Sequence, residues 1–494
     1  MLVLAKVATL IDGHRTVLDI VHELREYAQS QDVFHVLFIL SDWDLIVSDD
    51  FNPQTVVCWQ RPEAAKRLRS LFESCEPSLR SLVSINPDDD FPVFSYAAIP
   101  NRPVNESGKE EKGLGSQEMY TAGSGFTRQE GILAALGELA ETMGVTRTDG
   151  VKITRATVKE VGRKGIHPRQ LLMFSERQYD NRERWRKRYG ERHQIPFPVQ
   201  TNVALDWVTV TSYPDKRPYL VPAGYCYLNY PRDRNYIVAD SNGCAAAPTR
   251  TEAIVSGFLE LVERDAVAIW WYNRIPRPAI DSVYFNDPDL DQCVHWMNRH
   301  NRLFYVLDLT HDYDIPVIAA ISVNSGETDI AMGFGANFDC LSAIKSAVRE
   351  MLQLHALKRI IERQIAASGV ESLDQSARAF ISWAQGDFVK THPHMRPGGI
   401  NRTSEELRSL TRPRDSEEAL QSCSTLCRQK NQQFFVLDLT PPSFKVPVVR
   451  IIVPGMRHFQ ARFAPGRLYQ VPVVMGWRST AISENDLTQL PILI

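Results

Sequence analysis

The segment FLELVERDAVAIWW, residues 258–271, is the feature that most limits how this chain can fold. Its apolar residues surround the predicted helix instead of forming one stripe, and a helix that is apolar on nearly every side is usually buried. An unpaired buried carboxylate is costly, so it normally neutralises, pairs with a cation or binds a metal. The fold must therefore provide partners for the charged residues of this helix, which are Glu260, Glu263, Arg264 and Asp265.

Two other predicted helices carry polar pairs with the same spacing. The segment ILAALGELAETMG contains Glu138 and Glu141, and the segment AIKSAVREMLQLHAL contains Glu350 and Gln353. Residues at positions i and i+3 lie on one face of a helix, so the two members of each pair share a face. A single pair of this kind is more often an exposed polar stripe. Three pairs within strongly apolar helices favour convergence on one site that holds several carboxylates.

Clustered carboxylates predict a bound cation and a phosphate ligand, because like charges at short range cannot all ionise without cations. Mg²⁺ prefers oxygen ligands and commonly bridges carboxylates to phosphates, so a nucleoside triphosphate would complete its coordination. The chain contains no G-x-x-x-x-G-K-[ST] motif, which excludes an ordinary P-loop. The segments GSGFT (residues 123–127) and SNGCAAAPT (residues 241–249) each precede one of the helices and are predicted to present backbone N–H groups to phosphates.

The composition of the chain limits the classes of protein to which it can belong. The chain has 494 residues, 44% hydrophobic content and a net charge of -3, which suits a large globular protein and gives no indication of nucleic-acid binding. No apolar run reaches the roughly 18 residues of a transmembrane helix, so no membrane association is expected. Eight scattered cysteines indicate a reducing cytoplasm rather than a disulfide scaffold. Cys423 and Cys427 are interpreted as ordinary helical cysteines rather than zinc ligands.

The chain divides into three parts. Residues 1–83 predict a small helical, winged-helix-like block, in which Thr16 has the chemistry of an N-cap and a second helix is followed by a short strand. Residues 84–120 are rich in proline, glycine and charge, which predicts a linker that is partly disordered. Residues 121–494 alternate helices and strands and form the main domain.

An internal similarity sets the fold class of the main domain. FYVLDLTHDYDIPVIAAIS (residues 304–322) and FFVLDLTPPSFKVPVVRIIV (residues 434–453) share an apolar strand, Leu-Asp-Leu-Thr, a turn and a second strand. Pro316 and Pro447 begin the second strands, where a missing N–H is tolerated. The pattern predicts one supersecondary unit used twice. An α+β domain around a large, mostly antiparallel sheet is therefore expected rather than a doubly wound parallel sheet.

Several of these segments together resemble one protein family. SNGCAAAPTRTEAIVSGFLELVERDAVAIWW, GFGANFDCLSAIKSAVREMLQ and GSGFTRQEGILAALGELAE resemble the signature segments of the YcaO family, in the family's order. LDWVTVTSY, VPAGYCYLNYP and VPVVRIIVPGMR resemble connecting strands of its peptide-maturase branch, the azole- and azoline-forming cyclodehydratases. The resemblance extends over about residues 120–480 and implies a YcaO-type catalytic domain in residues 121–494.

The resemblance implies roles for individual residues, in a site that binds ATP and Mg²⁺. It assigns no catalytic base. The residues that it implies for the Mg²⁺–ATP cluster are Glu138, Glu141, Glu260 and Glu263. The residues that it implies as supporting nucleotide contacts are Ser241, Asn242, Glu252, Arg264, Glu350 and Gln353.

The implied activity is ATP-dependent cyclodehydration of a ribosomally made precursor peptide. Phosphorylation of a backbone amide oxygen lets a Cys, Ser or Thr side chain close a thiazoline or oxazoline ring. Thioamide formation, macroamidine formation and a catalytically weakened scaffold that binds leader peptide or partner remain open as alternatives. The resemblance implies a precursor peptide substrate and a leader-binding, E1-like partner protein, and it leaves open whether two copies of the chain associate.

Four departures from the family pattern bear on these alternatives. Thr142 stands where the family often has arginine after the second glutamate, and Ser124 stands where lysine is common. The sequence ends QLPILI, with Pro491 in place of a Pro-x-Pro-x-Pro tail, and the first block lacks the β-hairpin that usually leads such modules. The missing tail leaves the catalytic base unassigned, and it leaves room for thioamide or macroamidine formation or for a weakly active subunit that depends on its partner. The first block leads us to expect that a separate partner binds the leader peptide.

Overall fold

The computed structural model describes residues 2–42, 46–47, 58–59, 70–71, 74–75, 79–100, 121–148, 150–190, 193–281, 285–373, 375–386, 388–399, 402, 406 and 412–492. The chain forms two compact units. The smaller unit comprises Met1–Thr142 and Thr440–Pro447, and the larger unit comprises Met143–Leu439 and Val448–Ile494.

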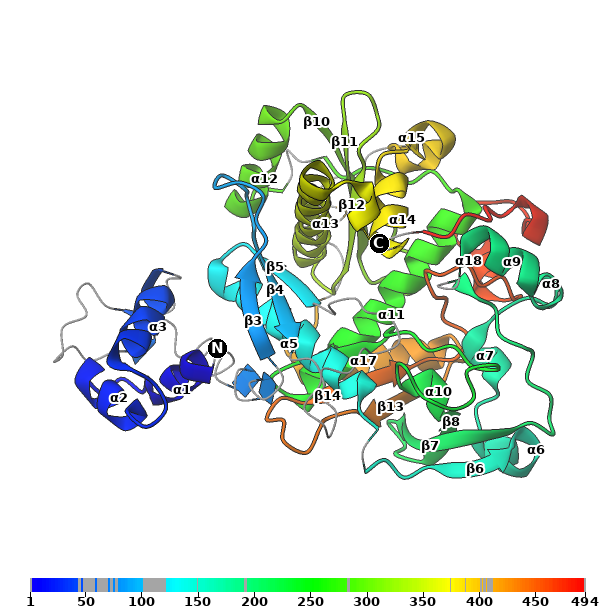
Figure 1. The fold of residues 1–494 in the computed structure, drawn as a ribbon. Helices are drawn as coiled ribbons and strands as arrows, with labels where there is room; N and C mark the ends of the chain where they lie inside the picture. Colours follow the sequence, from blue (N-terminus) through cyan, green and yellow to red (C-terminus); the bar gives the residue numbers. More distant parts are fainter. Residues whose placement is uncertain are drawn as a thin grey trace. The chain divides into compact units, whose positions relative to one another are not determined.

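The smaller unit begins with three helices and a pair of short strands (Figure 1). The helices are α1 (Leu2–Leu10), α2 (Val17–Leu24) and α3 (Ser30–Asp42), and β1 (Ile46–Val47) pairs with β2 (Cys58–Trp59) in antiparallel orientation. The side chain of Thr16 accepts the backbone N–H of Asp19, and the side chain of Asp19 accepts the backbone N–H of Thr16, which completes a capping box. The capped helix, the helix after it and the short strand predicted from the sequence are confirmed, whereas α1 is an addition.

The rest of the smaller unit is an antiparallel sheet of β3 (Leu79–Ser84), β4 (Phe94–Pro100) and β5 (Thr121–Gly125), followed by α5 (Arg128–Thr146). The prediction of a linker over residues 84–120 is therefore wrong for residues 94–100, and residues 101–120 lie outside the described residues. The polar segment NPDDDFP forms the turn between β3 and β4. Asn86 fixes this turn, since its side chain donates to Val93 O and accepts the N–H of Ser95.

The larger unit contains two further sheets, and every pairing in them is antiparallel. The first has the order β6 (Thr154–Thr157), β7 (Ala204–Tyr213), β13 (Phe434–Asp438), β14 (Val448–Ile452), β9 (Cys244–Ala246), with β8 (Pro218–Pro222) pairing with β7. The second has the order β10 (Arg302–Asp308), β11 (Val317–Asn324), β12 (Ala331–Ala336). The predicted internal repeat corresponds to the β10–β11 and β13–β14 hairpins, so the α+β fold class and its repeated unit are confirmed.

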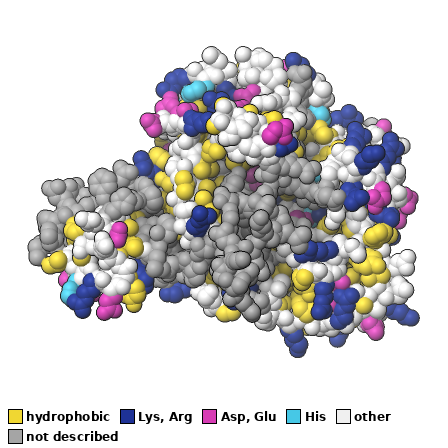
Figure 2. Space-filling view, viewed as in Figure 1, with side chains coloured by type: hydrophobic (Ala, Val, Ile, Leu, Met, Phe, Trp, Pro, Cys, Tyr) yellow, Lys and Arg dark blue, Asp and Glu magenta, His cyan; other side chains and the backbone are white. Residues whose placement is uncertain are grey.

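The larger unit also contains shorter helices. Among the described residues, no helix combines the length and apolar composition that a membrane crossing requires. Lys and Arg side chains gather over α8 (Glu176–Asp180) and α9 (Arg182–Tyr189) in Figure 2. The helices are α6 (Val158–Val161), α7 (Pro168–Leu172), α8 (Glu176–Asp180), α9 (Arg182–Tyr189), α10 (Ala223–Cys226), α12 (Pro288–Arg299), α14 (Gln375–Ala384), α15 (Phe388–Thr391), α17 (Ser416–Gln429) and α18 (Arg467–Val474). Cys423 and Cys427 lie buried on α17, as helical cysteines.

Two long helices organise the core of the larger unit, α11 (Arg250–Asn273) and α13 (Cys340–Ser368) (Figure 1). Helix α11 packs against β14, β9, β11 and β12 as well as α17 and α18, which explains why it is apolar on nearly every side. Helix α13 lies so close to β12 that a side chain at Gly333 would place its Cβ 2.1 Å from Met351 N. The close approach of α13 to β12 therefore depends on glycine at this position.

Candidate functional site

One carboxylate of α11 and one carboxylate of α13 meet at β12, an outer strand of its sheet. The backbone N–H of Ala336 donates to Glu263, and the backbone N–H of Phe334 donates to Glu350. Both N–H groups point away from β11, because residues of the same parity in a strand direct their N–H groups to the same side. The edge of β12 thus positions one carboxylate from each helix.

Arg264 lies between the carboxylates of α11. Its Nη2 is 3.4 Å from Glu260 Oε1, and its Nη1 is 3.1 Å from Glu263 Oε1. The side chains of Glu260 and Glu263 are 25% and 12% exposed, so the cluster is half-buried and opens to solvent on one side. Arg264 is the partner that a buried helix carrying these carboxylates requires.

Burial disfavours ionisation of these three carboxylates. Burial raises the pKa of Glu260, Glu263 and Glu350, and the positive charge of Arg264 lowers the pKa of each. The charges of Glu350 and Glu260 raise the pKa of Glu263 further. The site therefore carries more carboxylates than one arginine can neutralise, which favours binding of additional cations.

The segment before α11 is fixed against the same helix. The backbone N–H of Gly243 donates to Glu260 Oε2 at 3.2 Å. Gly243 has a φ of 78°, and a side chain there would place its Cβ 2.3 Å from Ile451 O, so only glycine fits. Asn242 is buried, with Nδ2 2.6 Å from His458 Nδ1, whereas Ser241 is exposed. Asn242 therefore fixes the turn, and Ser241 presents the more accessible side chain.

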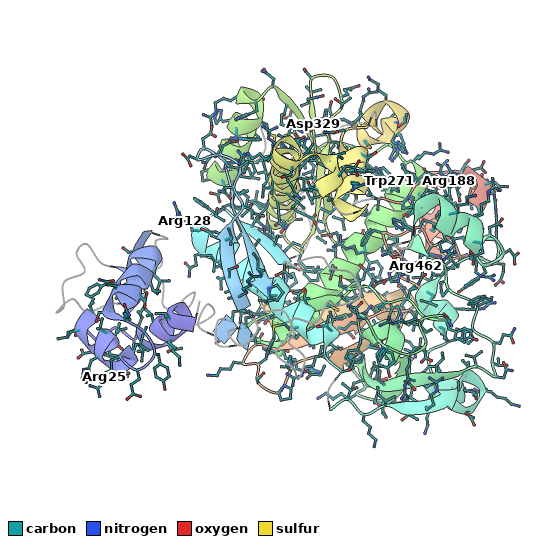
Figure 3. All side chains as sticks on the ribbon, in the orientation of Figure 1. Arg25, Arg128, Arg188, Trp271, Asp329 and Arg462 are labelled. Carbon is teal, nitrogen blue, oxygen red and sulfur yellow. The ribbon has the colours of Figure 1, made fainter. Side chains whose placement is uncertain are left out.

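A buried charge cluster supports this turn. Asp240 forms ion pairs with Arg450 and Arg462, each at 3.0 Å, and its carboxylate is 2.8 Å from His458 Nδ1. Arg462 is labelled in Figure 3. Although burial raises the pKa of Asp240, the charges of His458, Arg462 and Arg450 lower it well below its usual range. Sequence reasoning missed this cluster, because its members come from segments more than 200 residues apart.

The other predicted site residues lie on α11, α13 and α5. Glu252 accepts the N–H of Thr249 at 3.1 Å in the capping box of α11, about 12 Å along the helix from Glu260. Gln353 is half-buried one turn after Glu350 on α13. Glu138 and Glu141 lie on α5, within the smaller unit, and their role in the cluster stays a prediction.

The segment GSGFT lies directly before α5, as the sequence predicts, and its first three residues form part of a strand. Residues 123–125 belong to β5 and pair with β4. A side chain at Gly123 would place its Cβ 2.1 Å from Ala135 N, so this glycine permits close packing of α5 on the sheet. The side chain of Glu130 accepts the N–H groups of Phe126 and Thr127 at the start of α5. The prediction that this segment presents backbone N–H groups to phosphates stays a prediction.

One charged residue of the site was missed. Arg349 lies next to Glu350 in sequence, and its charge lowers the pKa of that carboxyl, although less than Arg264 does. Arg349 is half-buried on α13. The signal was present in the segment VREMLQ, where a basic residue directly precedes the predicted carboxylate.

The residues of this site fit a Mg²⁺–nucleotide ligand. Within the described ranges, no three His, Cys, Asp or Glu side chains are arranged to hold a metal ion by themselves. Mg²⁺ is commonly held by one or two carboxylates together with phosphate oxygens and water, so a complete protein cage is not needed. Nε of Arg264 is buried and has no hydrogen-bond partner among the described residues, which leaves a donor for an anionic ligand.

Replacing Arg264 by methionine is expected to lower the free energy of unfolding by about 2 kcal/mol. This loss lies between the losses that follow from breaking an exposed ion pair and from breaking a buried one. The variant would leave Glu260 and Glu263 without their cation. Urea denaturation measures the change. Arg250→Met removes an exposed charge from the same helix and is expected to change stability by less than about 0.5 kcal/mol; equal stability of the two variants would contradict the pairing.

Comparison with known proteins also indicates a site that binds ATP and Mg²⁺. A family model described as YcaO cyclodehydratase, ATP- and Mg²⁺-binding, matches residues 122–457. A heterocyclase solved in complex with substrate and cofactor is 32% identical with a TM-score of 0.74, covering 84% of this chain and 54% of that chain. The heterocyclase TruD is 34% identical with a TM-score of 0.63, covering 74% of this chain and 50% of that chain. This chain thus spans about half the length of these two heterocyclases.

A third solved structure shows the same fold at lower identity. YcaO from Methanopyrus kandleri, bound with AMPPCP and Mg²⁺, is 20% identical with a TM-score of 0.57, covering 80% of this chain and 91% of that chain. The family match covers more than half of the chain and includes both carboxylate-bearing helices of the larger unit. This chain is a member of the YcaO cyclodehydratase family, an ATP-dependent family that binds Mg²⁺.

Proposed function

We propose that this chain is an ATP-dependent cyclodehydratase that converts Cys, Ser or Thr residues of a ribosomally made precursor peptide into thiazolines or oxazolines. The observation that carries the proposal is the placement of Glu263 and Glu350 on the edge of β12, with Arg264 beside them. Two heterocyclases that are more than 30% identical to this chain support the proposed reaction.

The proposed chemistry follows from the charges of the site. Bound Mg²⁺–ATP supplies the phosphoryl group that makes a backbone amide oxygen a good leaving group. Glu260, Glu263 and Glu350 would hold the cation. Arg264 would orient the phosphates through its planar set of donors. A thiol or hydroxyl then attacks the amide carbon, the oxygen leaves as phosphate, and the peptide loses one water in total.

We propose a precursor peptide and a leader-binding partner protein as the molecules that this chain meets. Residues 2–42 form a three-helix block that lies outside the family match, which begins at residue 122. A separate module of this kind is suited to protein or peptide docking. If the partner presents the leader peptide, the turnover of precursor by the chain alone is expected to be slower than turnover with the partner.

The product of the reaction tests the proposed function. Each ring is expected to remove one water from the precursor peptide, with about one ATP consumed per ring. Mass spectrometry measures the loss of water, and alkylation measures the remaining thiols. Replacement of oxygen by sulfur would instead indicate a thioamide. Loss of water with every thiol, serine and threonine unchanged would indicate a macroamidine, and an unmodified peptide in the presence of the partner would indicate a scaffold.

A further inference from the structure

A second charged pocket lies in the larger unit, away from the carboxylate site. Its volume is about 550 Å³. Its lining includes four cationic side chains, Arg169, Lys430, Arg457 and Arg467, and one carboxylate, Asp312. Arg467 and the main chain of Arg457 contact Asp265 of α11. Asp265 is about 100° around that helix from Arg264, so the pocket lies over a different face of α11 from the carboxylate site.

Arg457 is a buried cation whose donors are incompletely satisfied. Arg457 is 2% exposed, and its Nη2 donates to Pro465 O at 2.8 Å. Its Nε and Nη1 have no hydrogen-bond partner among the described residues. Burial lowers the pKa of Arg457 to about 10, so the group remains charged at neutral pH. The charge of Asp265 favours the charged form of Arg457, but Nε and Nη1 still lack acceptors. Buried donors without acceptors are costly, which indicates that a ligand supplies the missing acceptors.

The carboxylates near Arg457 are already shared by other cations. Asp312 accepts Arg467 Nη2 at 2.7 Å and is 3.4 Å from Lys430 Nζ. Asp265 accepts Arg467 Nη2 at 2.6 Å and is 2.9 Å from His311 Nε2. The lining of the pocket therefore has more cations than carboxylates, and two donors of Arg457 lack an acceptor while its neighbour Arg467 is fully engaged.

The shape of the pocket combines an anion site with an apolar wall. Gly466 precedes α18, and the first N–H groups of a helix have no intrahelical acceptors, so this end of α18 favours negative charge. Met173, Val471 and Val474 also line the pocket, and Val474 is 73% exposed at its rim. An inorganic anion would make no use of this apolar wall, whereas a peptide carries both a carboxylate and apolar side chains.

We propose that this pocket binds a carboxylate-bearing apolar segment of a peptide, with the carboxylate on Arg457 and the apolar side chains on α18. The proposal rests on the proposed function, which supplies a peptide as substrate. It adds a place on the catalytic domain, outside the carboxylate site, that holds the peptide.

Fluorescence anisotropy tests the pocket with a labelled hexapeptide of alanine, leucine and valine that ends in a free carboxylate. The same peptide with an amidated C-terminus is expected to bind roughly tenfold more weakly or worse, because a charged hydrogen-bond acceptor is lost. Arg457→Met is expected to weaken binding of the free acid to a similar extent. Arg428→Gln removes an exposed charge from α17, two residues before Lys430, and is expected to leave binding unchanged.

Stability separates a binding role from a structural one. Removal of an unpaired buried charge is expected to leave the melting temperature of Arg457→Met unchanged or higher. If Arg457→Met does not fold, Val474→Asp places a carboxylate at the exposed rim and is expected to weaken binding by roughly tenfold. Equal binding of the free acid and the amide would overturn the proposal. Wild-type affinity in the Arg457 or Val474 variant would also overturn it. So would displacement of the labelled peptide by phosphate as efficiently as by the unlabelled free acid.

Calorimetry of ATP with Mg²⁺ on the same variants separates this proposal from the proposed function. Nucleotide affinity is expected to stay unchanged in Arg457→Met and Val474→Asp, since neither residue lies in the carboxylate site. A wild-type protein that binds the peptide but no nucleotide would overturn the proposed function alone. A protein that binds nucleotide but does not distinguish acid from amide would overturn the pocket alone.

Discussion

Replacing Glu260 and Glu263 together by glutamine is expected to weaken Mg²⁺-dependent binding of ATP by roughly 100-fold or more. The two carboxylates are half-buried on one face of α11, and Arg264 alone cannot neutralise them together with Glu350. Glutamine keeps the size of each side chain but removes the charge that a hard cation requires. Isothermal titration calorimetry of ATP in the presence of Mg²⁺ measures the loss.

Glu252 offers a matched control on the same helix. Glu252→Gln removes one charge from α11, and glutamine still completes the capping box with Thr249. Its nucleotide affinity is therefore expected to match that of the wild type. Unchanged affinity in the double variant would contradict the carboxylate site, and a large loss in Glu252→Gln would restore the nucleotide contact that the sequence predicts for this residue.

Gly333→Ala is expected to destabilise the larger unit by about 3 kcal/mol. The added Cβ would lie 2.1 Å from Met351 N and 2.4 Å from Ala347 O, which are backbone atoms of α13. Backbone atoms cannot rotate away as a flexible side chain can, so α13 must move off β12. Because Glu350 accepts the N–H of Phe334 on this strand, nucleotide affinity is expected to fall as well.

The same hairpin provides the control for this substitution. Gly326 lies in the turn between β11 and β12, and the nearest atom to an added Cβ is Asn324 Oδ1 at 3.4 Å, an ordinary contact. Gly326→Ala is therefore expected to change stability by less than about 0.5 kcal/mol. Chemical denaturation and calorimetry of both variants test the packing. Equal stability of Gly333→Ala and wild type would show that α13 does not lie this close to β12.

Sequence patterns were sufficient to predict the features that depend on a single helix or a single hairpin. The apolar character of residues 258–271 predicted burial of α11, and its charged residues predicted a charge partner, which is Arg264. The repeated Leu-Asp-Leu-Thr frame predicted two equivalent hairpins, and both are antiparallel. These predictions succeeded because periodicity and strand signals are local properties of the chain.

Contacts between distant segments could not be predicted from the sequence. The glycines of residues 123–125 have the composition of a loop, but they form a strand because α5 packs closely on β5. The pairing of Asp240 with Arg450 and Arg462 joins segments that share no sequence pattern. The polar turn at residues 86–92 resembles a linker in composition, although Asn86 orders it as a hairpin. In each case tertiary packing determined the structure, and local propensity did not.

The most direct test of the proposed function follows the oxygen atom of the peptide bond. A precursor peptide carrying heavy oxygen in the amide before a reactive cysteine would be treated with the protein, its partner, ATP and Mg²⁺. Amide-oxygen phosphorylation predicts that the heavy oxygen appears in inorganic phosphate, in proportion to the rings formed, as measured by mass spectrometry. Rings formed with unlabelled phosphate, or label released as water, would contradict the account.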